Sequence, residues 1–508
     1  MRRAEGRSGR LNLAWWTFLG SIALVGILTL ILSLSDPSWE RSKTSQGPPL
    51  MVFCAAGLKG PVEAVAKEYQ NQTGREIQLQ YGGSNTLLAS LQVGGRGDLF
   101  IPADESYIAT AREKGVIAEV LPIARMKLAL VVPMGNPKKI RSLQDLLTRK
   151  LRVAQANPES AAVGKVAREV LTKRGLWKAL EERTFVTKPT VTEVASDVQI
   201  GAVDAAIVWD AIPRQIDGLE IVPSPELETG TAKIASCVTT GCNQPQAALH
   251  FARYLGSRDR GQSIFRRFGL EADEGDLWED IPEVKLLAGA MLRPAIEKTV
   301  VAFEDREGVR ISRVFNGCGI LVSQMLGGNM VPDAFFACDR EFMKQVDDFF
   351  TLPTAVSGNQ LVILVAKGNP HQIRKLRDLG RPGLRVGIGH EKQCAMGVIT
   401  QKTLREDRTS EIVMKNVRVQ SPTGDMLVNQ MLTGSLDAVI AYISNAAGHA
   451  DRLEAVALDL PCALAEQPFA VSKSSRHPHL MGRLLAALQT SQSRETFEAL
   501  GFTWKGTP

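Results

Sequence analysis

The sequence has few cysteines for its length, only seven in 508 residues, and the odd number leaves at least one thiol without a partner in the chain. A scaffold held together by disulfides is therefore excluded, and the fold must rest on packing. The sequence also lacks a basic block interleaved with aromatic residues, although Lys and Arg exceed Asp and Glu by 60 to 54. A nucleic-acid surface needs such a block, so nucleic acid is not expected as a partner.

The chain also lacks the short motifs that mark many enzymes and metal sites. It contains no His-x-x-x-His, no Cys-x-x-Cys, no phosphate-binding Gly-x-x-x-x-Gly-Lys loop and no Gly-x-Ser-x-Gly turn. These motifs carry zinc ligands, phosphate cradles and serine nucleophiles. We therefore expect a protein that binds rather than catalyses, with no catalytic residues, no cofactor and no resident metal.

The overall composition is that of a soluble globular chain with more than one domain. Hydrophobic residues make up 44% and charged residues 22% of the sequence, which excludes both disorder and a polytopic membrane protein. At about 150 residues per domain, the length corresponds to two to four domains.

One long hydrophobic run stands at the N-terminus. Residues 11–35 contain no charged side chain, and this length is sufficient to span a bilayer. Residues 1–10 carry four arginines, whereas Asp36 and Glu40 follow the run, so the positive-inside rule predicts a cytoplasmic basic segment at 1–10 and an extracytoplasmic remainder. We predict a transmembrane anchor at 11–35 and a flexible linker at 36–49. A cleaved signal peptide is the alternative.

An internal repeat follows the linker. The Gly-Asn-Pro sequence of residues 135–137 recurs 233 positions later at 368–370, and the Gly-x-x-Asp of residues 201–204 recurs at 434–437. A period of this size is that of a complete domain. The sequence therefore predicts two copies of one module, at residues 50–280 and 281–508.

Within each copy, short apolar runs alternate with amphipathic helical patterns. In the first copy, residues 51–55, 77–81, 128–133 and 205–209 are strand-like, whereas residues 61–72 and 86–92 are helical. This alternation predicts an α/β fold with a mainly parallel sheet. Ligands of such folds bind beyond the carboxyl ends of the strands, where helix N-termini present N–H groups to an anion.

Four motifs connect the chain with a known family. Residues 52–58 (Val-Phe-Cys-Ala-Ala-Gly-Leu) and 83–87 (Gly-Ser-Asn-Thr-Leu) match turns that carry serines in the family, residues 98–104 (Asp-Leu-Phe-Ile-Pro-Ala-Asp) match its Asp-Leu-Phe-Ile-Ser-Ala-Asp signature, and residues 207–209 (Ile-Val-Trp) stand where Ile-Val-Tyr is usual. On these motifs each copy resembles a periplasmic molybdate-binding protein of ABC transporters, in the type II solute-binding class. The resemblance implies two α/β lobes per module, a periplasmic location, an ABC permease as partner, and molybdate or tungstate, with sulfate as a further candidate, as the ligand.

The resemblance also assigns binding residues by position. In the first copy they are Gly57, Ser84, Val163, Val191 and Trp209. In the second copy they are Met291, Cys318, Met396, Gly424 and Tyr442.

The binding positions depart from the family pattern. Family sites hold the anion with two serines, a tyrosine and backbone N–H groups, but the first copy keeps only Ser84 of these hydroxyls and the second keeps only Tyr442. Each charge-assisted hydrogen bond is worth about 1.5–3 kcal/mol, so two losses weaken binding by about 10² to 10⁴. The first copy, with small Gly57, remains suited to an oxyanion, and the second, with bulky Met291 and Met396, is less suited.

These departures leave alternatives open. In the first alternative, the chain is a tethered sensor or scaffold, and its degenerate clefts bind a partner protein or nothing. The sulfur atoms of Met291, Cys318, Met396 and Cys394 suggest a soft-metal ligand such as Cu(I), although Met and Cys also fill apolar pockets. Cys394, with His390 as a base, is a candidate nucleophile.

Overall fold

The computed structural model describes residues 47–272, 274–328 and 330–506. The predicted basic segment at 1–10 and the anchor at 11–35 lie outside these residues, as does nearly all of the linker. In the part of the chain that the structure describes, no helix combines the length and the hydrophobicity that a bilayer crossing requires.

The first copy folds as one mixed sheet divided between two lobes. Its strands follow the order β2-β1-β3-β9-β4-β7-β5-β6, and β1 pairs in parallel with both β2 and β3. Two further strands, β8 and β10, pair with β4. The strand bounds are β1 (Leu50–Ala55), β2 (Ile77–Gly82), β3 (Leu99–Ile101), β4 (Ile117–Pro133), β5 (Val153–Ala156), β6 (Thr184–Lys188), β7 (Ala205–Trp209), β8 (Leu219–Val222), β9 (Thr231–Thr239) and β10 (Glu271–Ala272).

Strand β4 joins the two lobes. Its N-terminal part, residues 117–127, pairs with β9 in the first lobe, whereas residues 128–133 pair with β7 and β8 in the second. The chain returns to the first lobe between β8 and β9. Two connections therefore link the lobes, which is the geometry of a hinged pair that closes on a ligand.

The helices of the first copy follow the strands and cover the sheet. Helix α9 begins where it does because the Thr190 side chain caps it, accepting a hydrogen bond of 3.3 Å from the Glu193 N–H. The helix bounds are α3 (Lys59–Thr73), α4 (Ser84–Gly94), α5 (Glu105–Glu113), α6 (Leu143–Thr148), α7 (Ala162–Lys173), α8 (Trp177–Arg183), α9 (Val191–Gln199), α10 (Pro245–Gly256) and α11 (Gly261–Arg267).

The second copy repeats this topology. Its strand order, β12-β11-β13-β19-β14-β17-β15-β16, corresponds strand for strand to that of the first copy. The strands are β11 (Glu283–Gly289), β12 (Arg310–Asn316), β13 (Ala334–Phe336), β14 (Thr354–Ala366), β15 (Val386–Gly389), β16 (Val417–Ser421), β17 (Ala438–Tyr442), β18 (Leu453–Ala457), β19 (Leu464–Val471) and β20 (Thr503–Trp504). The helices are α12 (Arg293–Glu307), α13 (Cys318–Leu326), α14 (Arg340–Lys344), α15 (Ala395–Glu406), α16 (Ser410–Met414), α17 (Gly424–Leu432), α18 (Pro478–Leu488) and α19 (Ser491–Ala499).

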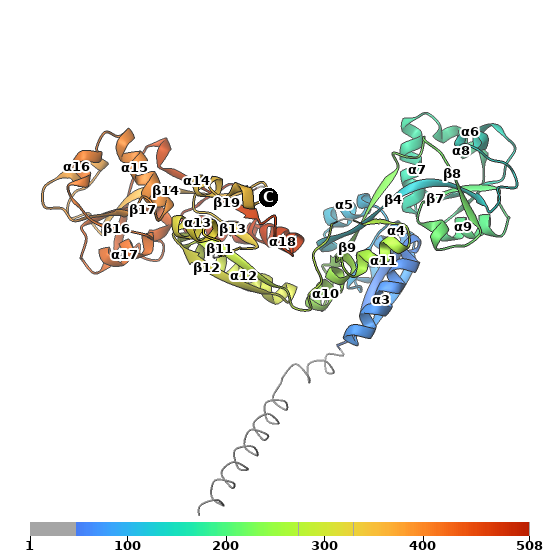
Figure 1. Ribbon diagram of the computed structural model, residues 1–508, viewed down its shortest axis with the longest axis horizontal. Coiled ribbons are helices and arrows are strands. Elements are labelled where there is room, and N and C mark those ends of the chain that lie inside the picture. The colour runs from blue at the N-terminus through green and yellow to red at the C-terminus, as the bar shows by residue number, and fades with distance from the viewer. Residues whose placement is uncertain (1–46, 273, 329, 507–508) are drawn as a thin grey trace, which may run out of the picture.

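Each copy has its own hydrophobic core. One cluster of buried side chains runs from Leu50 to Leu270 and a separate one from Val284 to Phe502. The predicted α/β fold of two tandem, two-lobed modules is therefore confirmed for the described residues. Figure 1 shows the modules joined through their first lobes, with the second lobes at the two far ends.

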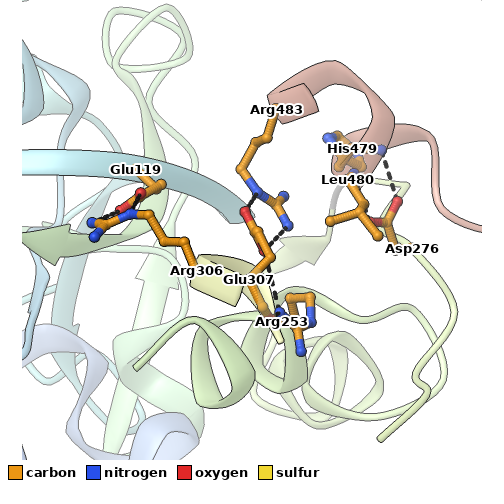
Figure 2. Close-up of polar contacts among 8 residues, drawn as sticks. All are labelled: Glu119, Arg253, Asp276, Arg306, Glu307, His479, Leu480 and Arg483. Carbon is orange, nitrogen blue, oxygen red and sulfur yellow. Dashed lines mark hydrogen bonds and ion pairs between the residues drawn. The ribbon is translucent and has the colours of Figure 1, made fainter. Parts of the chain in front are cut away.

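A buried charge cluster lies where the modules meet. The carboxylate of the buried Glu307 on α12 accepts hydrogen bonds from Arg253 of the first module at 3.2 Å and from Arg483 of its own module at 2.6 and 3.0 Å (Figure 2). Burial by itself would raise the pKa of Glu307, but the charges and hydrogen bonds of Arg483 and Arg253 outweigh it and hold that pKa below its ordinary value. This carboxylate therefore stays ionised at neutral pH.

Two further contacts support the junction. Asp276, in the connection between the modules, accepts hydrogen bonds from the backbone N–H groups of His479 and Leu480 at 2.8 and 3.0 Å, in the first turn of α18. Arg306 also pairs with Glu119 on β4 of the first module (Figure 2). The connection and both modules are thus held together by charged groups at several points.

Candidate functional site

A small cavity lies between the lobes of the first module. It encloses about 20 Å³. Gly57, Ser84 and Ala103 line it from the first lobe, and Val163, Val191 and Trp209 line it from the second. The structure thus brings together all of the residues that the sequence singled out in this copy, at or just beyond the carboxyl ends of β1, β2, β5, β6 and β7.

Helix N-termini surround this cavity. Helix α4 begins at Ser84, α7 at Ala162 and α9 at Val191, and each of these residues lines the cavity. The first turn of a helix has N–H groups without intrahelical partners and carries the positive end of the helix dipole. Because no lining residue in the described part carries a charged side chain, the site is suited to an anion that is held by neutral donors alone.

Ser84 supplies a hydroxyl at the cavity wall. Its side chain is 1% exposed, and its Oγ accepts a hydrogen bond of 3.2 Å from the Ala103 N–H. This bond fixes the oxygen and leaves the hydroxyl proton available for a ligand, because no acceptor for it is found among the described residues. Trp209, 1% exposed, stands where the family has a tyrosine and brings an indole N–H in place of a hydroxyl.

The lobes of the first module touch at the mouth of the cavity. The Asn85 N–H donates to the Ser160 carbonyl at 3.1 Å, and the Asn85 side chain donates to the Glu159 carbonyl at 2.8 Å. A Cβ on Gly83 would lie 2.5 Å from the Ser160 oxygen, so only glycine permits this approach. The structure therefore shows the module with its lobes closed.

The second module has a cavity of the same size at the equivalent place. Four of the five predicted residues, Met291, Met396, Gly424 and Tyr442, line this cavity of about 20 Å³. Cys318 lies behind its wall, fully buried, and its Sγ accepts a hydrogen bond of 3.0 Å from the Cys338 N–H. This contact repeats that of Ser84 with Ala103, with sulfur in place of oxygen.

Polar atoms of the second cavity differ from those of the first. A Cβ on Gly424 would lie 2.3 Å from the Asn445 Oδ1, so an amide side chain occupies space beside α17. The Tyr442 hydroxyl is buried and has no hydrogen-bond partner among the described residues. Burial raises the pKa of Tyr442 well above its ordinary value, so the hydroxyl stays protonated and can act as a donor.

Sequence reasoning missed Cys338, which lines the second cavity. The signal was present, because the Asp-Leu-Phe-Ile-Pro-Ala-Asp of residues 98–104 recurs as Asp-Ala-Phe-Phe-Ala-Cys-Asp at residues 333–339. Ala103 therefore corresponds to Cys338, at an offset of 235 instead of 233.

The geometry does not support a nucleophilic cysteine. Cys394 is 5% exposed, and burial raises its pKa to about 11, whereas a reactive cysteine needs a lowered pKa. Its Sγ lies 3.6 and 3.5 Å from the carbonyl oxygens of His390 and Ser421. The His390 Nδ1 accepts from the Lys392 N–H at 3.2 Å, so this ring nitrogen is engaged elsewhere.

The comparison with protein families finds two matches in the chain. The model of a family described as bacterial extracellular solute-binding protein matches residues 50–271 and again residues 284–503. These ranges coincide with the two folded modules and together cover most of the chain.

The similar proteins align with this chain over about the length of one module. The molybdate-binding protein ModA of Mycobacterium bovis is 29% identical over 259 residues, which cover 49% of this chain and 97% of that protein. A putative ABC transporter substrate-binding lipoprotein of Bacillus subtilis, YvgL, is 26% identical over 255 residues, again 49% of this chain and 97% of that protein. Among solved structures, the periplasmic molybdate-binding protein of Azotobacter vinelandii is 23% identical, with a TM-score of 0.39, and covers 44% of this chain and 100% of that one.

Proposed function

The chain belongs to the family of bacterial extracellular solute-binding proteins, as two tandem copies, and we propose that its first module binds a tetrahedral oxyanion of the molybdate and tungstate type for an ABC transporter. It is a binding protein and not an enzyme. The observation that carries the proposal is the convergence of the N-termini of α4, α7 and α9 with the Ser84 hydroxyl on one small, uncharged cavity.

The donor chemistry supports an oxyanion and not a cation. Backbone N–H groups, a hydroxyl and an indole N–H all donate hydrogen bonds, and the cavity wall offers no carboxylate to a cation. Relatives that match nearly their whole length to this chain include molybdate-binding proteins, and a shorter match is a sulfate-binding protein of Synechococcus elongatus. Molybdate and tungstate are therefore the first candidates and sulfate the next.

Membrane attachment and the ABC permease are further parts of the proposal. A helix at residues 11–35 would hold both modules, at 50–280 and 281–508, on the outer side of the cytoplasmic membrane. The closed, ligand-bound first module would then be the form that a permease recognises.

The side chains of the second cavity favour a role for the second module that differs from oxyanion binding. Met291 and Met396 stand where the first module has Gly57 and Val163, and Asn445 fills space beside Gly424. The family's hydroxyl donors are reduced to Tyr442. We propose that this cleft no longer takes a tetrahedral oxyanion, in line with a module that serves as a sensor or scaffold.

Calorimetric titration with molybdate, tungstate, sulfate and phosphate tests the proposed ligand class. Ser84→Ala removes a charge-assisted hydrogen bond worth about 1.5–3 kcal/mol, so the affinity of the preferred anion is expected to fall by about 10- to 150-fold. Ser90→Ala is the matched control, because Ser90 lies on the same helix but does not line the cavity and bonds only the Thr86 carbonyl. A folded protein that gives no heat with any of the four anions would rule the proposal out.

A further inference from the structure

Sulfur atoms are concentrated around the second cavity. Five residues of this cleft contain sulfur, and their counterparts in the first cleft contain none. Met291, Cys318, Cys338, Cys394 and Met396 correspond to Gly57, Ser84, Ala103, Ala161 and Val163. Since the two modules share topology and register, this difference lies in the side chains of the cleft and not in the fold.

Two of the thiols lie close together, and a third lies at a strand end of the other lobe. A Cβ on Gly289 would stand 2.1 Å from the Cys338 Sγ and 3.2 Å from the Cys318 Sγ, so both thiols crowd one glycine of β11. A Cβ on Gly389 of β15 would stand 2.9 Å from the Cys394 Sγ. Glycine at these two strand ends thus makes room for thiols that approach from both lobes.

Four of these sulfur-bearing residues line the cavity itself: Met291, Cys338, Cys394 and Met396. Cys338 follows β13 in one lobe and Cys394 follows β15 in the other, so the two thiols line the cavity from opposite sides. Cys318 is engaged by the Cys338 N–H behind the wall. A cavity of about 20 Å³ has room for a single small ion or a water molecule.

The remaining polar groups do not favour a hard cation. In the described part of the chain, no three side chains of His, Cys, Asp or Glu converge where they could hold a metal ion. A site of this kind would therefore contain at most two thiolates, completed by thioethers. Thiolate and thioether ligands together select Cu(I) and similar soft ions over Zn²⁺, Mg²⁺ or Ca²⁺.

We propose that the second module binds one soft monovalent metal ion, Cu(I) or its analogue Ag(I), through the thiolates of Cys338 and Cys394 and the thioethers of Met291 and Met396. Each thiol that binds the ion releases its proton to solvent. The buried Tyr442 hydroxyl, which has no partner among the described residues, lines the same cavity and is placed to donate a hydrogen bond to a bound thiolate. This inference is independent of oxyanion binding by the first module.

The test is a titration of the full chain with Cu(I), and separately with Ag(I), in the presence of a competing chromogenic chelator. The thiols are kept reduced by a phosphine that does not itself contain sulfur. We expect one ion per chain to be retained against the chelator. The paired variant Cys338→Ser with Cys394→Ser is expected to lose about 100-fold in affinity, or to retain no metal.

A matched control separates the cleft from the other thiols. Cys242 and Cys462 are half-buried and do not line the second cavity, so Cys242→Ser with Cys462→Ser should leave the uptake unchanged. Met291→Leu with Met396→Leu conserves side-chain volume and is expected to weaken uptake while the chain stays folded by circular dichroism. Sulfur-only scattering around copper in X-ray absorption would support the proposed ligands.

Three results would overturn the proposal. They are no uptake by a folded chain, uptake that survives in the Cys338 and Cys394 variant, and uptake that disappears in the Cys242 and Cys462 control. Ser84→Ala should change none of these measurements, because Ser84 lies in the other module.

Discussion

Glu307→Gln is expected to destabilise the junction between the modules by about 3–5 kcal/mol, because it leaves the buried Arg253 and the largely buried Arg483 without their counter-charge. The side chains of Arg253 and Glu307 are 5% and 2% exposed, so water cannot replace the lost pairing. Urea unfolding of residues 47–508 measures this loss of stability. Because Arg253 belongs to the first module and Arg483 to the second, the variant should also loosen one module from the other, which small-angle scattering would detect.

An exposed ion pair of the second module serves as the control for Glu307. Glu283 pairs with Arg310 at 2.8 Å, but their side chains are 67% and 62% exposed. Such pairs contribute about 0–1 kcal/mol to stability. Glu283→Gln should therefore unfold at nearly the same urea concentration as the unmodified protein. Equal unfolding midpoints for the Glu283 and Glu307 variants would show that the buried cluster does not hold the junction.

The pH dependence of the junction follows from the lowered pKa of Glu307. A carboxyl whose folded pKa lies below its unfolded value, about 4.3 for Glu, stabilises the fold above that value and loses this contribution as pH falls through the folded pKa. The unmodified protein and Glu307→Gln should therefore differ most in their free energy of unfolding at neutral pH, and this difference should shrink below about pH 4.

Gly57→Met is expected to abolish oxyanion binding by the first module. A Cβ at this position would stand 2.9 Å from the Val191 Cγ1 and 3.3 Å from the Trp209 Cδ1, so any longer side chain enters the cavity. The loss should be about 100-fold or more, equivalent to at least two charge-assisted hydrogen bonds. The fold should persist, because Met291 occupies the corresponding position of the second module.

Gly94→Ala is the control for Gly57→Met. Gly94 lies in the same module, on α4, and a Cβ there would meet nothing within 4 Å. Calorimetry with the preferred anion should give an unchanged affinity for Gly94→Ala. An unchanged affinity in Gly57→Met as well would mean that the anion binds elsewhere.

The internal repeat and the alternation of apolar runs with helical patterns made the fold predictable from the sequence. The strands at residues 51–55, 77–81 and 205–209 were expected from apolar runs, and the structure places β1, β2 and β7 there within one residue. The sequence did not predict all of the strands at which the chain crosses between the lobes. Only residues 128–133 of β4 were expected, because its first half alternates irregularly and pairs across two register shifts, and β9 was not expected at all.

The candidate site was predictable where local motifs mark it. The turns around Gly57 and Ser84 lie at strand ends, so their convergence follows from the topology of a parallel sheet. The contact of Cys318 with Cys338 needs two turns that are 20 residues apart to meet. The Arg253, Glu307 and Arg483 cluster depends on how the modules are placed against each other, and no local pattern encodes that placement.

The most direct test of the central claim is a crystal structure of residues 47–508 grown with molybdate, with the anomalous scattering of molybdenum measured. We predict one peak per chain, within hydrogen-bond distance of the Ser84 Oγ and between the N-termini of α4, α7 and α9, and no peak in the cavity beside Met291. A closed first module without a peak, or a peak in the second module alone, would contradict the account.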